Sequence, residues 1–224
     1  INAAQKEAYP SAPQTPTVIE LLKDTESGFD IGVETGSIAT YKCQNIVLNL
    51  NGHTLTLGHP PVGSSATLKT NGLRILPFSN LEITEGTINV DNDNVKIGIA
   101  NYGTLSLTDV EVNVDDNVKY TINNRGDLTL NGSTKINNGK AAPFIAITNQ
   151  PYNYPDNQNI NAKLNVTSEQ VVVGDVLVEL SEVSQSQTGA VNAGTPEINI
   201  SNGNFGEFML DGTDKVPVGN ITGG

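Results

Sequence analysis

Acidic and amide residues recur in this chain at a spacing that could build a cation site. Asp91-Asn-Asp93 and Asp115-Asp-Asn117 lie 24 residues apart. If the chain repeats with that period, the two groups stack on each other, and Ca²⁺ prefers such carboxylate and amide oxygens. The sequence therefore offers Asp91, Asp93, Asp115 and Asp116 as calcium ligands. The alternative is a plain solvated turn, which Asp and Asn also favour.

Glu85 and Asp109 share the same 24-residue spacing and raise the question of a glycoside hydrolase. Such an enzyme needs two carboxyl groups facing each other at about 5 Å or about 6.5–9.5 Å. Neighbouring strands of a sheet are about 4.8 Å apart, so stacking would bring the two side chains close. The simpler interpretation is a pair of solvated acids on an outer face, and we assign them no catalytic role.

The two arginines of the chain, Arg74 and Arg125, are the groups that a polysaccharide lyase would need. In a polysaccharide lyase, a basic residue removes a proton next to a carboxylate of the substrate, and calcium or arginine neutralises that carboxylate. Arg125 stands between Asn124 and Gly126, at an expected corner where an exposed side chain is the ordinary outcome. The acidic surface would also repel polyuronates. The sequence thus predicts no enzyme, with a carbohydrate-active lyase or hydrolase as the alternative.

Two long irregular segments, Gly58–Asn71 and Asn149–Asn161, are expected to be loops. Binding residues are often found on long loops of a rigid scaffold. The second segment contains Tyr152 and Tyr154, and aromatic faces suit the apolar surfaces of sugars. The predicted ligand-binding residues are Tyr152, Asn153, Tyr154 and Asn157. The alternative is a loop whose tyrosines pack back onto the scaffold.

Composition restricts the partners of the chain. It has 224 residues, a formal net charge of −12 and two arginines, so it would repel a nucleic-acid backbone or an anionic membrane. No apolar run approaches the roughly 18 residues of a membrane span. Cys43 is the single cysteine, so no internal disulfide is possible. His53 and His59, without a nearby cysteine, make a poor transition-metal site. We expect no nucleic-acid partner and no membrane insertion in this segment.

The sequence overlaps with itself at a nearly constant shift, which predicts a repeat architecture. The matches at a shift of 24 are Leu81 with Leu105, Ile83 with Leu107, Ile88 with Val112 and Val90 with Val114. The matches at shifts of 23 and 25 include Ile99 with Ile122, Asn101 with Asn124, Leu105 with Leu128, Leu107 with Leu130 and Ile122 with Ile147. Upstream, a shift of 33 brings Leu48, Leu50, Leu55 and Leu57 onto Leu81, Ile83, Ile88 and Val90, and the Gly58–Asn71 insertion explains its length.

Apolar residues alternate along each unit, so each strand has one dry face that a single unit cannot bury. Stacking the units buries these faces in a narrow interior column, which needs few large side chains. A hydrophobic content of 37% with 5% aromatic residues fits such a column. We predict an all-β fold, a right-handed, single-stranded parallel β-helix with about 22–25 residues per three-sided coil. Corners with left-handed or tight backbone are expected at Asn101, Gly103, Asn124, Gly126 and Gly132.

The expected organisation is one domain. Residues 1–16 are predicted to be a linker or lead-in, and residues 17–224 a single β-helix domain. Thr17–Lys23 is expected to be either a first strand or a capping helix. The sequence lacks an initial Met and a signal peptide, so we expect a processed chain or a fragment of a larger protein.

Several stretches resemble pectate-lyase-like adhesin domains of bacterial surface proteins. They are Asn45-Ile-Val-Leu-Asn-Leu-Asn-Gly-His-Thr-Leu-Thr-Leu57, the Ile-x-Asn-x-Gly-x-Leu-x-Leu rungs at Ile99 and Ile122, and Ile198-Asn-Ile-Ser-Asn-Gly-Asn-Phe205. Similar repeats occur in phage appendage and fibre proteins. The resemblance implies a pectin-lyase-like solenoid in a secreted, cell-surface or virion-surface protein. It specifies function weakly, because function resides in sites grafted onto a fold.

The expected function is a non-enzymatic surface or appendage module for adhesion, presenting loops to a glycan or to a host or bacterial surface protein. The first alternative is a carbohydrate-active β-helix enzyme. The second is a phage fibre or capsid-decorating protein, which would be a trimer where the adhesive module would be a monomer. No cofactor is expected apart from the calcium considered above.

Overall fold

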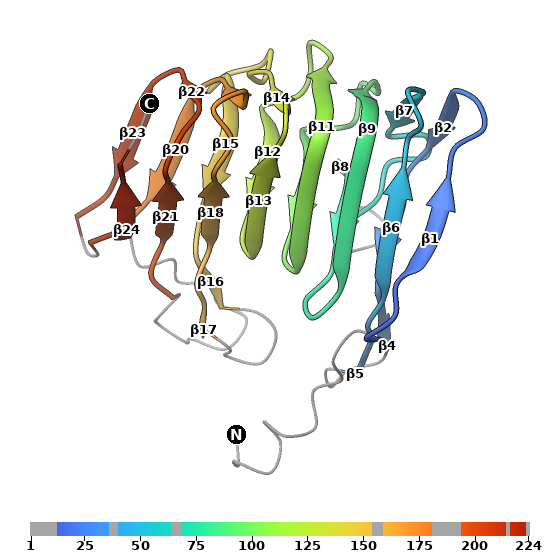
Figure 1. The fold of residues 1–224 in the computed structure, drawn as a ribbon, viewed down its shortest axis with the longest axis horizontal. Helices are drawn as coiled ribbons and strands as arrows, with labels where there is room; N and C mark the ends of the chain where they lie inside the picture. The colour runs from blue at the N-terminus through green and yellow to red at the C-terminus, as the bar shows by residue number, and fades with distance from the viewer. Residues whose placement is uncertain are drawn as a thin grey trace.

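A computed structural model of the chain describes residues 13–35, 40–63, 69–153, 159–180, 194–213 and 216–222. All regular elements in these ranges are β-strands. None of the described residues belongs to a helix that could cross a membrane. The strands form a thirteen-stranded sheet and a seven-stranded sheet, here called sheet A and sheet B. Successive coils follow one another along the long axis of the molecule, from blue β1 to red β24 (Figure 1).

Each coil contributes strands to three parallel stacks. The first stack of sheet A consists of β1 (Thr17–Glu20), β6 (Asn45–Asn49), β9 (Asn80–Val90), β11 (Thr104–Val114), β13 (Asp127–Asn131), β18 (Lys163–Val166), β21 (Glu197–Ile200) and β24 (Val218–Ile221). The second stack consists of the latter halves of β9 and β11 with β2 (Thr25–Ser27), β7 (Thr54–Leu57), β14 (Lys135–Ile136), β19 (Val172–Val173) and β22 (Asn204–Phe205).

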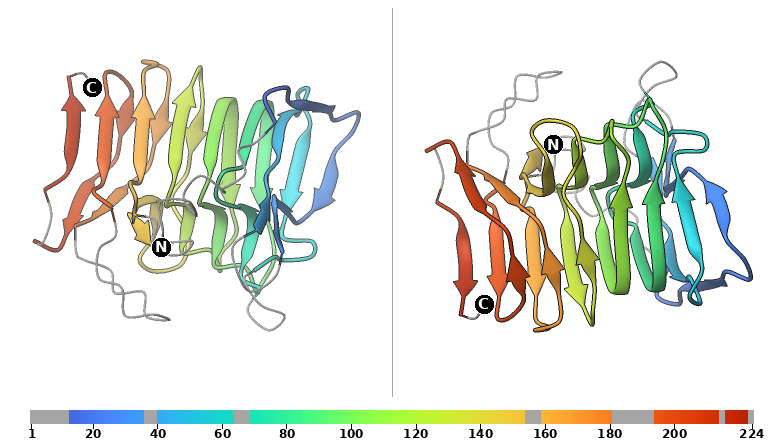
Figure 2. Two further views of the ribbon diagram at one scale, coloured as in Figure 1. Left: turned by 90° about the horizontal axis from the view of Figure 1, so that it is seen from below. Right: turned by 90° about the horizontal axis from the view of Figure 1, so that it is seen from above.

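Sheet B forms the third stack. Its strands are β3 (Phe29–Ile31), β8 (Asn71–Ile75), β10 (Ile97–Asn101), β12 (Tyr120–Asn124), β15 (Ile145–Asn149), β20 (Val176–Glu179) and β23 (Phe208–Asp211). Two antiparallel hairpins are β4 (Val33–Thr35) with β5 (Thr40–Lys42), and β16 (Tyr152–Asn153) with β17 (Asn159–Ile160). Views from below and above show the coils lying side by side in chain order (Figure 2). The predicted parallel β-helix is therefore confirmed, and Thr17–Glu20 is a strand rather than part of a capping helix.

The register between coils follows the sequence overlap. Leu81 pairs with Leu105 and Ile88 with Val112 across β9 and β11, as the shift of 24 predicts. Ile122 pairs with Ile99 on one side and with Ile147 on the other. One inward column of sheet A contains Ile19, Leu48, Ile83, Leu107, Leu130, Val166, Ile200 and Ile221.

The predicted upstream shift is only half correct. Leu55 and Leu57 pair with Ile88 and Val90 at a shift of 33, as expected. Leu48, however, pairs with Ile83 at a shift of 35. The difference arises because β6 and β7 are separate strands joined by a turn, where His53 N donates to Leu50 O at 2.8 Å, whereas β9 runs through the same bend unbroken.

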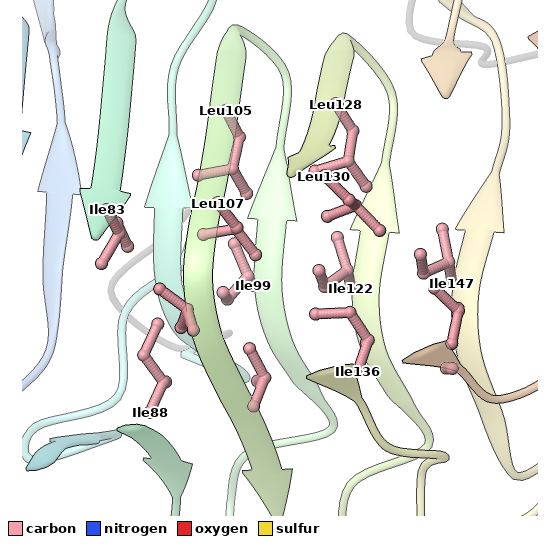
Figure 3. Close-up of a cluster of buried hydrophobic side chains, with 14 of the residues drawn as sticks. Ile83, Ile88, Ile99, Leu105, Leu107, Ile122, Leu128, Leu130, Ile136 and Ile147 are labelled. Atoms are coloured by element: carbon pink, nitrogen blue, oxygen red, sulfur yellow. The ribbon is translucent and has the colours of Figure 1, made fainter. Parts of the chain in front are cut away.

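Between the sheets, the apolar columns form one continuous core. Ile83, Leu105, Leu107, Leu128 and their neighbours are 2% exposed or less. Their side chains project into the space between the two layers, where those of successive coils lie beside one another (Figure 3). Burial of these stacked Leu, Ile and Val side chains supplies the main stabilising term, because each removes apolar surface from water.

The chain turns at the predicted corners, between β10 and β11, between β12 and β13, and after β13, but the backbone there differs from the prediction. Among the five residues expected to bend the chain, only Gly132 has a positive φ, at 59°. Gly103 and Gly126 are required for close approach instead, because a Cβ at Gly126 would collide with the carbonyl oxygen of Gly103. The left-handed residues that bend β9 and β11 are Glu85 and Asp109, with φ of 58° and 57°.

Asn101 and Asn124 are the last strand residues before two of these corners, and Asn101 Oδ1 accepts a hydrogen bond from Gly103 N at 3.1 Å. Together with Asn149 they form a buried ladder of side chains. All three are 0% exposed. The Asn101 Nδ2 donates to Asn124 Oδ1 at 2.8 Å, and Asn124 Nδ2 donates to Asn149 Oδ1 at 2.7 Å. Each amide also donates to a backbone carbonyl at or beside the start of a sheet A strand; for Asn101 and Asn124 that strand belongs to the following coil, for example Asn124 Nδ2 to Lys163 O at 2.8 Å. We call this set the inner ladder; it fixes the corner between sheet B and sheet A.

Candidate functional site

One polar residue from each of five consecutive coils lies outside this corner. Each directly follows an inward residue of sheet B, so the alternation of side chains turns it outward. The inward residues are in register from coil to coil. We call the set the polar row, and its members are Tyr102, Arg125, Gln150, Glu179 and Asp211.

Contacts within the polar row run between neighbouring coils. The guanidinium carbon of Arg125 lies 5.7 Å from the centroid of the Tyr102 ring, a cation–π distance. Arg125 Nε also donates to Asn123 Oδ1 at 3.2 Å. Gln150 Nε2 donates to Glu179 Oε2 at 3.0 Å. The row thus sets an aromatic ring, a guanidinium, an amide and carboxylates side by side at the spacing of the coils.

Burial changes the acidity of groups in and beside the row. It raises the pKa of Glu179, and the negative charge of Asp211 raises it further. The charge of Arg125 and the hydrogen bond from Gln150 act in the opposite direction. Burial also raises the pKa of Tyr120, with a contribution from the charge of Glu179. Glu179 therefore holds its proton to a higher pH than an exposed glutamate does.

On the same outward face, the next residues along the strands are covered. Ala100, Asn123 and Thr148 are 2%, 7% and 3% exposed. Thr148 Oγ1 is buried and has no hydrogen-bond partner among the described residues. A buried hydroxyl without a partner costs free energy. The residues in register with them on the next two coils, Leu177 and Met209, are partly exposed, so this face is covered beside Tyr102, Arg125 and Gln150 but not beside Glu179 and Asp211.

Two long connections begin at this corner on successive coils. Residues 150–162 connect β15 to β18, and residues 180–196 connect β20 to β21. The first contains the predicted binding loop. Tyr152 and Asn153 form β16, paired with β17, whereas Tyr154 and Asn157 lie outside the described residues. Tyr152 and Asn153 therefore belong to the same coil as Gln150.

A charged row continues around the corner on the first stack of sheet A. Asp127, Lys163 and Glu197 are in register on consecutive coils. Lys163 Nζ lies 3.5 Å from Glu197 Oε2. Burial raises the pKa of Asp127; the charge of Lys163 lowers it and that of Glu197 raises it. Counting both rows, four carboxylates face two basic groups, so the corner is net acidic.

The predicted calcium ligands lie elsewhere, at the turns after β9 and β11. Asp91, Asp93, Asp115 and Asp116 are exposed. Asn117 Nδ2 donates to Asp93 Oδ1 at 3.2 Å, so the expected stacking of the two turns is present. Within the described residues, no group of three or more His, Cys, Asp or Glu side chains is arranged to hold a metal ion.

Glu85 and Asp109 are exposed at the bend of β9 and β11, and each bonds to a neighbouring coil. Asn49 Nδ2 donates to Glu85 Oε2 at 3.3 Å. Asp109 Oδ1 accepts hydrogen bonds from Ser133 N at 2.8 Å and Ser133 Oγ at 3.0 Å. These bonds lower the pKa of Asp109. Both acids therefore have partners that hold coils together at the bend.

Arg74 has a structural environment. It is 7% exposed on the outward face of β8. Its Nε and Nη2 donate to the two carboxylate oxygens of Asp30 at 3.0 Å and 2.8 Å. This bidentate pair links the first coil to the second, because Asp30 and Arg74 are in register on β3 and β8.

Comparisons with known proteins do not identify the chain. No protein-family model matches it, and neither the curated proteins nor the solved structures contain a significant match.

Most of the polar row was missed by sequence reasoning. Only Arg125 was considered, and as a single residue. A signal was present in the repeat, since Tyr102 and Arg125 occupy the same position in the two Ile-x-Asn-x-Gly rungs and Gln150 follows the corresponding Asn149. Glu179 and Asp211 carry no such signal, because their coils have Val178 and Leu210 where the rungs have Asn.

Proposed function

We propose that this chain is a non-enzymatic β-helix module that binds glycans at the polar row, within a secreted, cell-surface or virion-surface protein. The observation that supports the proposal is the mixture of groups in the row. Saccharide hydroxyls both donate and accept hydrogen bonds, and Gln150, Glu179 and Arg125 together supply donors and acceptors. Tyr102 adds an aromatic ring.

The scaffold under the row favours binding without rearrangement. The inner ladder lies directly before Tyr102, Arg125 and Gln150 in the chain, and the buried Val178 before Glu179, so the backbone of these four residues loses little freedom on binding. An adhesive module of this kind matches the resemblance to pectate-lyase-like adhesin domains.

A glycoside hydrolase is the second candidate. Glu179 and Asp211 are in register on neighbouring parallel strands, whose spacing of about 4.8 Å approaches the carboxyl separation of about 5–5.5 Å in retaining enzymes. The raised pKa of Glu179 suits a general acid. Asp211 is exposed at the last described strand of sheet B, which leaves one side of the pair open to water.

A glycan-array screen, run with and without calcium, tests the proposal. Each bound glycan is then incubated with the protein and assayed for new reducing ends. We expect binding without release of reducing ends. Release that Glu179→Gln abolishes would replace the binding module with the hydrolase, and a chain that binds no glycan on the array would remove the proposal.

A further inference from the structure

We infer that a second copy of this chain docks head to tail on the C-terminal end of the solenoid, with β24 of one copy pairing with β1 of the next. The inference is independent of glycan binding. It replaces the monomer or trimer considered from the sequence with a linear assembly.

Both ends of the solenoid have unpaired strand edges. Among the described strands, β1, β2 and β3 of the first coil each pair with one neighbour only, and so do β22, β23 and β24 of the last coil. β1 and β24 lie at opposite ends of the molecule (Figure 1). A free edge presents backbone N–H and C=O groups that can pair with a strand of another chain.

The last coil also leaves its inward apolar side chains open. Ile221 of β24 is 63% exposed, whereas Ile200, its partner one coil earlier, is 2% exposed. Leu210 of the same coil is 62% exposed, and the ring centroids of Phe205 and Phe208 lie 5.1 Å apart. A solenoid normally ends in a repeat with a polar outer face. This end is apolar instead, so contact with a further apolar coil would remove its surface from water.

The N-terminal end of the same chain can supply that further coil. β1 belongs to the same parallel stack as β24, and all of its residues are exposed. Ile19 and Ile221 belong to one inward column, so a copy placed one coil further along sets Ile19 beside Ile221. On the sheet B side, Ile31 is already covered. The contact is therefore made mainly by β1 and β2, in continuation of the coil-to-coil register within the chain.

Charge favours this arrangement over a contact between two C-terminal ends. Continuing the register places each acid of one end opposite an uncharged residue of the other. These pairs are Glu20 with Thr222, Asp24 with Asn204, Asp30 with Met209, and Asp211 with Gly32. A two-fold contact between C-terminal ends would instead bring Glu207 and Asp211 of both copies to one interface. Like charges placed opposite each other destabilise strand pairing.

The assembly is open-ended because the two contacting surfaces differ. Each added copy leaves one free end of each kind, so the interface is heterologous and builds a linear chain of copies. Each copy has a formal net charge of −12, which opposes the approach of another copy. Salt screens that repulsion, and association should therefore strengthen as ionic strength rises.

Sedimentation velocity over a concentration series from micromolar to millimolar tests the inference. The mean mass of the wild type should rise beyond that of a dimer, and more so at high salt. Ile19→Lys and Ile221→Lys each put a charge into one end, so each should weaken association by about tenfold or more. An equimolar mixture of the two variants should form dimers and nothing larger, because each variant keeps one intact end.

The same change in the middle of the molecule provides the control. Phe144 is 51% exposed and directly precedes β15, which has strands of sheet B on both sides. Phe144→Lys adds the same charge, and it should associate like the wild type. Circular dichroism checks that all three variants are folded.

The outcomes decide between the possible contacts. A wild type that stays monomeric at every concentration and salt overturns the inference. Association that stops at a dimer, and that Ile221→Lys abolishes while Ile19→Lys does not, overturns it in favour of a contact between two C-terminal ends. Loss of association in Phe144→Lys also overturns it. Each of these results leaves glycan binding to be decided by the array.

Discussion

Two ladders of asparagine side chains cross the solenoid, and their burial differs. The inner ladder, at the corner between the sheets, is fully buried. The outer ladder consists of Asn89, Asn113 and Asn137 on the outward face of sheet A and is half-buried. In the outer ladder, Asn137 Nδ2 donates to Asn113 Oδ1 at 2.6 Å and Asn113 Nδ2 donates to Asn89 Oδ1 at 3.4 Å. The same residue type therefore repeats at the same period in two environments.

The difference shows how environment assigns a role to a repeated residue. An amide of the inner ladder has no access to water, so each of its bonds must be made within the protein. Those bonds reach backbone carbonyls at or beside the starts of sheet A strands, such as Asp127 O and Ala162 O, and so fix the corner that carries the polar row. An amide of the outer ladder can exchange its partner for water. Loss of the inner ladder should therefore destabilise the fold much more than loss of the outer ladder.

The largest expected effect is a break in the inner ladder. Asn124→Ala removes the donor to Asn149 Oδ1 and to Lys163 O, leaving buried acceptors unpaired. We expect a loss of about 3 kcal/mol or more in the free energy of unfolding, measured by urea denaturation. The matched change Asn113→Ala on the outer ladder should cost less than about 1 kcal/mol. Equal losses for the two variants would contradict the comparison.

A smaller loss is expected at the glycine beside the inner ladder. A Cβ at Gly126 would collide with the backbone at Gly103, so the two coils must move apart. Gly126→Ala should destabilise by about 1–3 kcal/mol, the range for overpacked sites, which thermal unfolding followed by circular dichroism would measure. An unchanged melting temperature would show that the corner yields more easily than the ladder geometry indicates.

The pH dependence should separate the acids beside the two ladders. The raised pKa of Glu179 means that its protonated form favours folding, and that contribution is lost as pH rises through the folded pKa. Lys135 lowers the pKa of Glu111, beside the outer ladder, so its contribution is present above its ordinary pKa and lost as pH falls through the folded value. At pH 7, Glu179→Gln should preserve or raise stability and Glu111→Gln should lower it slightly. Both differences should shrink by pH 4, and urea melts at the two pH values measure them; the opposite signs at pH 7 would refute this assignment.

The smallest effect is expected from calcium. Four exposed acids follow the outer-ladder strands β9 and β11, but they form no group of three metal ligands: Asp91, Asp93, Asp115 and Asp116. Millimolar calcium should leave the melting temperature of the wild-type protein and of Asp115→Asn the same within error. A rise of several degrees that Asp115→Asn removes would restore the calcium site at these turns.

The repeat made the core predictable from sequence, because alternation and a constant shift identify which residues stack. The sequence pattern alone does not distinguish the two ladders. The repeat places asparagine at three positions that suggest solvent exposure, Asn101, Asn113 and Asn124. Only the path of the chain around the corner buries Asn101 and Asn124. Glu85 and Asp109 are exposed, as the sequence predicted, but their left-handed backbone depends on a bend within a strand that the alternation of apolar residues does not mark.

The polar row could be predicted only in part for a related reason. Tyr102 and Arg125 repeat with the rungs, whereas Gln150 precedes a long insertion that interrupts the overlap. Glu179 and Asp211 belong to coils whose spacing is lengthened by residues 150–162 and 180–196. Pairing across those insertions is set by three-dimensional stacking, which a one-dimensional shift does not detect.

The most direct test of the account compares two charge-neutralising variants in glycan binding. Glu179→Gln changes the polar row, and Glu82→Gln makes the same change on the exposed outer face of sheet A. The account predicts that, for the glycan bound most strongly on the array, Glu179→Gln weakens binding by about tenfold or more, whereas Glu82→Gln binds like the wild type. Equal binding by all three proteins, each folded by circular dichroism, would contradict the assignment of the polar row as the binding site.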